Sequence, residues 1–315
     1  MSTRDKLLAA IAKPVGTRLS GEKLAAHLGI SRTMVWKHIQ ILREGGLPIK
    51  GSARSDYRIN GPIDPTLAQF AKTSRIQPHY FFSTASTQTL AKGGAAAGLP
   101  EGNIWIAESQ TSGRGRFNRL WSSGYGGLWI SLLLRPPVTP VQVPSLTQIA
   151  AITLAQVIRR LTRIDARLKW PNDVVCQTPQ GWRKLAGFLT EMSAEMDRTH
   201  WVIIGMGLNV NNSLPEELKK IGTSLHGLTG RAFQRGAILR AFLSRFLNAY
   251  PRWMKEGFEP FRKDYWKLYR DPDERVRLQT SEGLVQGLVR GIDASGALLL
   301  QSKKGIKRYF EGELA

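Results

Sequence analysis

The chain has 315 residues, of which 42% are hydrophobic and 22% are charged, so it can bury more than one apolar core and is not a disordered polymer. Its 45 Lys and Arg residues exceed its 24 Asp and Glu residues, which gives a formal net charge of +21. A charge this large favours polyanionic partners such as nucleic acid, or phosphorylated ligands.

The single cysteine, Cys176, excludes a disulfide framework within the chain and is typical of a reducing compartment. The N-terminal stretch MSTRDKLLAAIAKP lacks an apolar core of signal-peptide length, and no apolar run approaches about 18 residues. We therefore expect a cytoplasmic protein without a membrane span.

Residues 1–60 contain 11 Lys or Arg against 4 Asp or Glu, and they predict three helices. An opening helix covers about Thr3 to Ala12. The stretch SGEKLAAHLG follows, with Ser20 as the N-cap, and SRTMVWKHIQILREGG comes next, with Ser31 as the N-cap. Two short helices joined by a glycine-containing turn of about three residues are typical of a helix-turn-helix.

The second helix of this motif has its apolar stripe at Val35, Ile39 and Leu42, so its remaining side chains are free to reach phosphates and base edges. The stretch LPIKGSARSDYRIN then predicts a β-hairpin wing with a basic tip. The alternative is a helical hairpin that only packs, with its charges solvated. The residues expected to contact DNA are Ser31, Arg32, Thr33, Trp36, Lys37, Gln40, Lys50 and Arg54.

After a probable linker at residues 61–66, the middle of the chain mixes strand and helix patterns. Strands are predicted at Ile104–Ser109, Leu128–Leu134, Ala166–Trp170, Leu185–Met192 and Trp201–Met206. Helices are predicted at Thr87–Ala97, Ser145–Leu161, Glu216–Leu218 with its flanks, Arg235–Met254 and Phe258–Tyr269. Strands cluster early and helices lie between or after them, which indicates an α+β fold with a mixed sheet.

Residues 271–315 carry 7 basic and 7 acidic side chains and read as short alternating strands separated by turns, which predicts a small β-barrel of four to five strands. We place the domain boundaries at 1–62 for the winged helix-turn-helix, 63–270 for the central domain and 271–315 for the barrel.

The stretch SGRGRFNRLWSSGYGG, residues 112–127, lies between two predicted strands. It is neither a Walker loop nor a dinucleotide fingerprint, because it lacks the required glycines and leads into a strand. A mobile glycine loop with Arg114 and Arg116 can fold over an anion and offer bidentate hydrogen bonds. The alternative is a solvated basic turn.

Three further motifs follow in the middle segment. In LKWPNDVV, Asp173 suits a ribose hydroxyl, a metal or a lysine, or it belongs to a plain hairpin turn. In RKLAGFLTEM, Lys184 suits a carboxylate or an α-phosphate, although most lysines are only solvated. In VIIGMGLNVNN, Asn209 ends a buried strand, and GTSLHGLTG after it is a second loop able to close over a ligand.

Taken together and in this order, the motifs resemble the biotin–protein ligase family, and with the N-terminal domain they resemble its bifunctional type, which also represses the biotin biosynthetic operon. The resemblance covers essentially the whole chain. It implies a central catalytic domain of the biotin/lipoate ligase type and a C-terminal SH3-like barrel. Catalytic roles are implied for Lys184, Arg116 and Asp173, the last with Asn172 in the Pro-Asn-Asp turn. Contacts to biotin or biotinyl-AMP are implied for Ser86, Thr87, Gln88, Gln110, Arg114, Gly115, Arg116, Trp121, Lys184 and Asn209.

The resemblance also implies the reaction: ATP and biotin form biotinyl-5′-AMP, with Mg²⁺ assisting, and a lysine of a biotin carboxyl carrier protein then accepts the biotin. Operator DNA and a ligand-promoted homodimer are the other implied partners. Gln88 stands where the family usually has asparagine, and Phe117 and Asn118 stand where the repressor type commonly has Arg and Gly. We expect this second departure to alter retention of the adenylate.

Alternatives from other classes are a lipoate-type acyl-adenylating ligase, a ligand-sensing DNA-binding regulator without ligase activity, and a purely nucleic-acid-binding protein that uses Arg114 and Arg116 as phosphate contacts.

Overall fold

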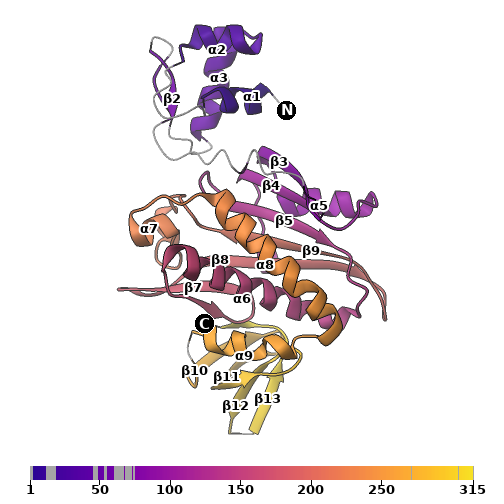
Figure 1. The fold of residues 1–315 in the computed structure, drawn as a ribbon. Helices are drawn as coiled ribbons and strands as arrows, with labels where there is room; N and C mark the ends of the chain where they lie inside the picture. Colours follow the sequence, from indigo (N-terminus) through magenta and orange to yellow (C-terminus); the bar gives the residue numbers. More distant parts are fainter. Residues whose placement is uncertain are drawn as a thin grey trace.

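The computed structural model describes residues 3–11, 19–44, 49–52, 55–59, 67, 73, 75–270, 272–303 and 305–314. They form three units along the chain, with a large mixed sheet in the middle, a helical unit at one end and a small sheet at the other (Figure 1). The predicted α+β class with an N-terminal helix-turn-helix is confirmed. The predicted boundaries at 62/63 and 270/271 stay predictions, and the first lies outside the described residues.

The N-terminal unit consists of α1 (Thr3–Ile11), α2 (Gly21–Leu28), α3 (Arg32–Glu44) and the short strands β1 (Ile49–Lys50) and β2 (Arg58–Ile59). The predicted caps set the helix ends. The Ser20 hydroxyl accepts from the Lys23 amide at 3.1 Å, and Gly29 ends α2 with φ of 64°. The β1–β2 pairing matches the predicted wing, whose tip, with Arg54, lies outside the described residues.

The central sheet has seven strands in the order β3-β4-β5-β9-β8-β7-β6, and only β3 and β4 run parallel. The bounds are β3 (Gln77–Thr84), β4 (Asn103–Gln110), β5 (Leu128–Leu134), β6 (Ala166–Lys169), β7 (Asp173–Thr178), β8 (Gly181–Ala194) and β9 (Thr199–Leu208). Strand β3 was not predicted, because Pro78 interrupts the pattern. The strand tolerates this proline because it lies at the edge of the sheet.

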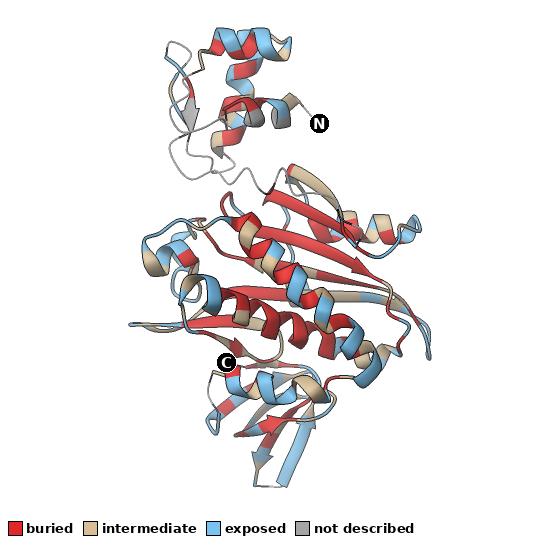
Figure 2. Cartoon of the chain, viewed as in Figure 1, coloured by how far each residue is buried: buried red, intermediate tan, exposed pale blue. Residues whose placement is uncertain are grey.

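Helices cover one face of this sheet and part of the other (Figure 2). The central strands β4 and β5 are buried, whereas much of β3 and β8 is only half-buried. The helices are α5 (Thr87–Ala96), α6 (Val143–Thr162), α7 (Leu225–Thr229), α8 (Arg235–Glu256) and α9 (Glu259–Leu268), with single 3-10 turns at Arg116–Asn118, Pro140–Gln142 and Glu216–Leu218. Trp105 and Leu133 pack with α5, whereas their neighbours Ile104 and Leu132 belong to the core that includes α6 and α8. Of the helix predicted around Glu216–Leu218, only a single 3-10 turn at these residues forms, because its exposed acidic side chains provide no apolar stripe for a longer helix.

By length and composition alone, the helix from Pro140 to Thr162 is apolar enough to cross a membrane. In the structure 78% of this apolar window is buried inside the protein, so its apolar surface is used in the core. Cys176 lies in the same core, where burial raises the pKa of its thiol to about 12.

The C-terminal unit is a five-stranded antiparallel sheet in the order β13-β12-β11-β10-β14, as predicted for the small β-domain. Its strands are β10 (Arg275–Thr280), β11 (Gly283–Ile292), β12 (Leu298–Ser302), β13 (Gly305–Tyr309) and β14 (Glu313–Leu314). It docks on the central domain through Gly296, whose carbonyl accepts from Gln148 Nε2 at 2.7 Å and from Trp170 Nε1 at 3.2 Å. This docking brings the short strand β14 close to the central sheet.

Candidate active site

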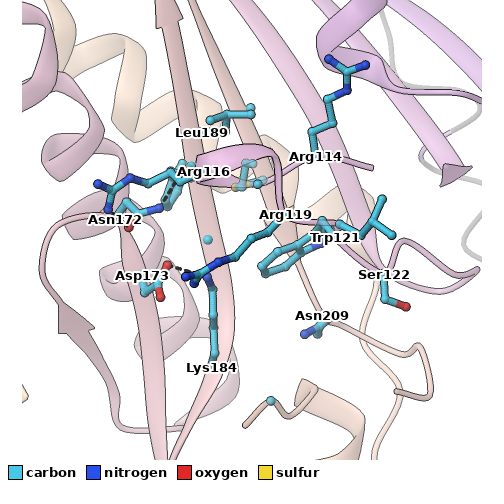
Figure 3. Close-up of a pocket in the computed structure, with 18 of the residues that line it drawn as sticks. Arg114, Arg116, Arg119, Trp121, Ser122, Asn172, Asp173, Lys184, Leu189 and Asn209 are labelled. Carbon is cyan, nitrogen blue, oxygen red and sulfur yellow. Dashed lines mark hydrogen bonds and ion pairs between the residues drawn. The ribbon is translucent and has the colours of Figure 1, made fainter. Parts of the chain in front are cut away.

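A cavity of about 470 Å³ opens on the central sheet and collects the motifs that the sequence analysis singled out. The strand β8 forms its floor, and the loop between β4 and β5 crosses over it (Figure 3). Glu313 and Leu314 of β14 also line the cavity. Every residue predicted to contact biotin or to act in catalysis lines this cavity. They are Ser86, Thr87, Gln88, Gln110, Arg114, Gly115, Arg116, Trp121, Asp173, Lys184 and Asn209.

The centre of the cavity is a lysine–aspartate pair stacked on a tryptophan. Lys184 Nζ lies 2.8 Å from Asp173 Oδ1 and 4.9 Å from the centroid of the Trp121 ring. The hairpin β6–β7 presents Asp173, and the neighbouring strand β8 presents Lys184. Because both partners are partly exposed, the pair remains accessible to a ligand in the cavity.

Two glycines make room for this arrangement. A Cβ at Gly207 would lie 2.5 Å from Trp121 Nε1, and a Cβ at Gly187 would lie 2.9 Å from Lys184 Cε. Both distances are shorter than any normal contact, so only glycine lets the indole and the lysine lie against the sheet. The indole N–H of Trp121 is buried and has no hydrogen-bond partner among the described residues.

A chain of polar side chains lies behind this centre. Gln110 Oε1 accepts from the Thr87 amide at 2.8 Å and from its hydroxyl at 3.0 Å, while Gln110 Nε2 donates to Ser123 at 2.8 Å. Ser131 lies 2.9 Å from Thr87 Oγ1 and donates to Gln88 Oε1 at 2.9 Å. The chain fixes the orientation of each amide before a ligand arrives.

Two polar groups at the end of the cavity near this chain of side chains can form further hydrogen bonds, judged from the described residues. The hydroxyl of Ser86 is buried without a recorded partner, and the Gln88 amide nitrogen makes only one long contact, 3.5 Å to the Leu189 carbonyl. Buried polar groups normally have partners, so this end of the cavity suits a ligand with polar atoms of its own.

The glycine-arginine loop closes over the cavity and contacts the C-terminal unit. Arg116 Nη1 donates to the Gly312 carbonyl at 3.1 Å and lies 3.4 Å from Asn172 Oδ1. Arg119 pairs with Glu313 at 2.5 Å, and this pairing lowers the pKa of Glu313. Burial lowers the pKa of Arg116, although Asp173 and Glu313 act in the opposite direction.

The departure at Phe117 and Asn118 has a definite conformation. Both residues have φ of 55°, in the left-handed region, which asparagine tolerates and phenylalanine rarely adopts. The Phe117 ring, 65% exposed, lies 4.9 Å from the Arg116 guanidinium and 5.9 Å from that of Arg119. Cation–π contacts on both sides thus offset part of the backbone strain.

Asn209 ends β9 at the far wall of the cavity. Its amide oxygen accepts from Asn212 Nδ2 at 3.0 Å, and its backbone amide donates to the Leu185 carbonyl at 3.0 Å. The second loop lies next to it, and residues between 214 and 222 line the cavity. Of the predicted stretch GTSLHGLTG only Gly222 does so, and most of the remainder forms α7. This lining segment is bonded to Lys184 itself, because the Lys184 amide donates to the Ile221 carbonyl at 2.8 Å.

The cavity also contains charged or aromatic residues that sequence reasoning did not assign to it, among them Lys169, Trp182, Arg270 and Glu313. Lys169 lies opposite Asp173 in the β6–β7 register, and the Arg270 amide donates to the Leu168 carbonyl at 3.0 Å. Burial lowers the pKa of Lys169, and the neighbouring Arg270 lowers it further. Only the strand register and the docking of the C-terminal unit bring these residues to the site, so no local motif signals them.

Within the described ranges no group of three or more His, Cys, Asp or Glu side chains is placed to hold a metal ion. The acidic side chains of the cavity are Asp173 and Glu313.

In the N-terminal unit, the expected DNA-contacting side chains lie on one helix and its wing. Arg32, Thr33, Trp36 and Lys37 are exposed on α3, whereas Val35 and Ile39 are buried. Gln40 is half-buried and Lys50 on β1 is exposed. Ser31 caps α3 by accepting from the Met34 amide at 3.2 Å, and Arg54 lies outside the described residues.

Comparison with known families divides the chain in the same way. Residues 80–209 match the biotin/lipoate A/B protein ligase family, residues 4–58 match an HTH domain, and residues 273–313 match the biotin protein ligase C-terminal domain.

Relatives match over nearly the full length. The bifunctional ligase/repressor BirA of Bacillus subtilis is 37% identical over 325 residues, covering 99% of this chain and 98% of the relative. BirA of Escherichia coli is 31% identical, covering 98% and 96%. The biotin protein ligase of Aquifex aeolicus in complex with biotin and ATP superposes with a TM-score of 0.66 at 29% identity, covering 76% of this chain and 97% of that one.

Proposed function

Because this chain belongs to the family of the bifunctional biotin–protein ligases and repressors, we propose that it adenylates biotin with ATP, transfers the biotin to a lysine of a biotin carboxyl carrier protein, and represses biotin synthesis by binding operator DNA. The observation that carries this proposal is that one cavity unites all the predicted ligand-contacting residues within a chain that also has a complete helix-turn-helix.

In the first step, biotin lies with its ring system at the polar end of the cavity. There the Ser86 hydroxyl and the Gln88 amide form hydrogen bonds with its ureido group. Its carboxylate then extends towards Lys184. This lysine and Arg116 neutralise the negative charge that builds up as the carboxylate oxygen attacks the α-phosphorus and pyrophosphate leaves.

A Mg²⁺ ion bound with the nucleotide would supply further charge neutralisation at the phosphates. A carboxylate with access to the cavity fits this ion, since Mg²⁺ in phosphoryl-transfer sites is commonly held by one or two carboxylates and the substrate phosphates.

In the second step, the amine of the acceptor lysine attacks the carbonyl carbon of biotinyl-AMP, and AMP leaves. Trp121 and the loop above it exclude water from this mixed anhydride, which would otherwise hydrolyse. Asp173 orients the incoming amine, a role supported by its position beside Lys184 at the cavity.

For repression, we propose that the adenylate orders the glycine-arginine loop and promotes a homodimer, so that two copies of α3 meet two half-sites of the operator. Trp36 and Lys37 are exposed on α3 as this role requires. We further propose that the protein acts in the cytoplasm without a membrane anchor, in agreement with its single, unpaired cysteine.

The test is to replace Lys184 and Asp173 by alanine and to measure biotin-dependent ATP–pyrophosphate exchange and labelling of a carrier domain. We expect both rates to fall by about 100-fold or more, as for removal of a charge-stabilising donor. The matched control is Lys92→Ala. Lys92 forms an ion pair with Glu191, and neither residue lines the cavity. Wild-type rates in both cavity variants would refute the assigned site.

A further inference from the structure

The cavity contains far more positive than negative charge. Seven cationic side chains and two anionic ones line it within the described part of the chain. The loop contributes Arg114, Arg116 and Arg119, the sheet contributes Lys169 and Lys184, and Lys220 and Arg270 complete the set, against Asp173 and Glu313.

The two carboxylates are already used. Asp173 pairs with Lys184 at 2.8 Å, and Glu313 pairs with Arg119 at 2.5 Å. Arg116 makes hydrogen bonds only to the neutral acceptors Asn172 and Gly312. Lys169 is half-buried and makes no hydrogen bond or ion pair with a described residue. Asp173 and Glu313 attract its charge, but burial and the neighbouring Arg270 outweigh them and lower its pKa.

Lys169 and Arg270 lie together at one side of the cavity. Lys169 pairs with Asp173 in the antiparallel register, so the two side chains share a face of the sheet. The Arg270 backbone amide donates a 3.0 Å hydrogen bond to the carbonyl of Leu168, the residue just before Lys169. Burial lowers the pKa of Lys169, and repulsion from Arg270 lowers it further. We call these two residues the basic rim.

Free ATP and biotin are anionic, so this charge helps the first step. After pyrophosphate leaves, however, most of the negative charge has gone and the cations remain. The group that enters next is the ε-amine of a lysine. An ordinary lysine has a pKa of about 10.4, so near pH 7 less than about 0.1% of it is the uncharged, nucleophilic amine. Asp173, a carboxylate of the cavity, is already paired with Lys184 at 2.8 Å.

We propose that the basic rim, Lys169 and Arg270, keeps the acceptor amine uncharged while it attacks the adenylate. This inference rests on the proposed ligase function. A lysine ammonium that enters this field releases its proton to water. Its nitrogen lone pair then forms the N–C bond to the biotinyl carbonyl carbon, and the C–O bond to phosphate breaks with its electron pair on AMP. The amine's second proton then passes to solvent water.

The expected size follows from Coulomb's law. One positive charge about 10 Å from an amine, at an effective dielectric constant of about 20, lowers the pKa of that amine by about one unit. Removing one rim charge should therefore move the midpoint of the pH–rate profile upward by about one unit. At neutral pH the transfer rate should fall about tenfold.

The experiment is a single-turnover transfer from preformed biotinyl-AMP on the full-length protein to a carrier domain, measured between pH 6 and pH 10. The variants are Lys169→Met and Arg270→Gln. Lys169→Arg keeps the charge, and Lys255→Met removes an exposed lysine from α8 that does not line the cavity. We expect the first two to shift the midpoint upward, and Lys169→Arg and Lys255→Met to leave it in place.

A second acceptor separates the protonation of the amine from other effects. Hydroxylamine is already uncharged at neutral pH, so its reaction with the bound adenylate should be the same in wild type and Lys169→Met. An equal loss with hydroxylamine and with the carrier domain would overturn the inference, since the rim would then act on the adenylate. A loss confined to ATP–pyrophosphate exchange would also overturn it, because Lys169 would then serve the leaving pyrophosphate.

The outcome is distinguishable from failure of the proposed function. If wild-type protein labels no carrier domain, the ligase function itself is wrong. If it labels the carrier and Lys169→Met and Arg270→Gln keep the wild-type midpoint, the function stands and the basic rim is wrong.

Discussion

The placement of Trp121 against the sheet makes Gly207→Ala an informative perturbation. The added methyl carbon would lie 2.5 Å from Trp121 Nε1, 2.6 Å from Cε2 and 3.0 Å from Cζ2. Carbon atoms in favourable contact are about 3.5–4.0 Å apart, so the indole must retreat by roughly 1 Å. Strain of this kind costs about 1–3 kcal/mol in a packed site.

A retreat of the indole also moves the ring on which Lys184 rests, because Lys184 Nζ lies 4.9 Å from its centroid. We therefore expect Gly207→Ala to weaken biotin binding by about 10- to 100-fold, with a similar loss of adenylation, since a misplacement of about 1 Å has an effect of this order. Isothermal titration calorimetry with biotin measures the first, and biotin-dependent pyrophosphate exchange measures the second.

The matched control is Gly124→Ala in the same loop. Gly124 is exposed, does not line the cavity, and a Cβ there would meet no atom within 4 Å. It should bind biotin within about twofold of wild type, as expected for a surface change. If Gly207→Ala also binds biotin as tightly as wild type, Trp121 does not need its observed position, and the reasoning from close contact is refuted.

Three further predictions concern stability and DNA binding. Glu108→Gln should destabilise the protein by about 3–5 kcal/mol in urea unfolding, because the buried Arg235 (1% exposed) would lose the negative charge that lies 2.6 Å away. Glu313→Gln removes the charge of an exposed pair and should cost less than about 1 kcal/mol. Equal losses of stability in the two variants would contradict this reasoning. Burial alone would raise the pKa of Asp293, but hydrogen bonds from Ser295 and Ala297 lower it overall, so its stabilisation is present at neutral pH and is lost as the pH falls through this lowered pKa. Asp293→Asn should therefore lower Tm at pH 7 and lower it much less at pH 3. If the difference in Tm between wild type and variant is the same at both pH values, the ionised carboxylate of Asp293 is not the source of the stabilisation. Lys37→Ala should reduce the slope of log K against log salt for operator DNA by about 1, and a slope equal to that of wild type would remove Lys37 from the phosphate contacts.

The predicted site residues that the structure brings to one cavity are mainly those that lie in contiguous motifs. Caps at Ser20 and Ser31 set the helices as expected, because each depends only on a hydroxyl and an amide three residues away. The glycine-arginine loop and Lys184 were recognised for the same reason: their chemistry and their neighbours are local in the chain.

The residues that were missed depend on distant parts of the chain. Lys169 looks like any solvated lysine until the β6–β7 register places it opposite Asp173. Glu313 belongs to an unremarkable C-terminal stretch until the docking of Gly296 on α6 brings β14 to the loop. Strand β3 was missed because Pro78 is compatible with a strand only at a sheet edge, and edges are a property of the assembled sheet.

The loop over the cavity has a position that links ligand binding to the rest of the molecule. One part of it, Arg116 and Arg119, contacts Gly312 and Glu313 of the C-terminal unit. Another part, Tyr125, belongs with Phe82 to the apolar cluster of the N-terminal helices, which includes Leu7. A ligand that draws Arg116 onto a phosphate competes with its bond to Gly312, so ligand affinity and C-terminal docking are coupled. Because coupling free energies are reciprocal, the effect of the ligand on this docking equals the effect of the docking on ligand affinity.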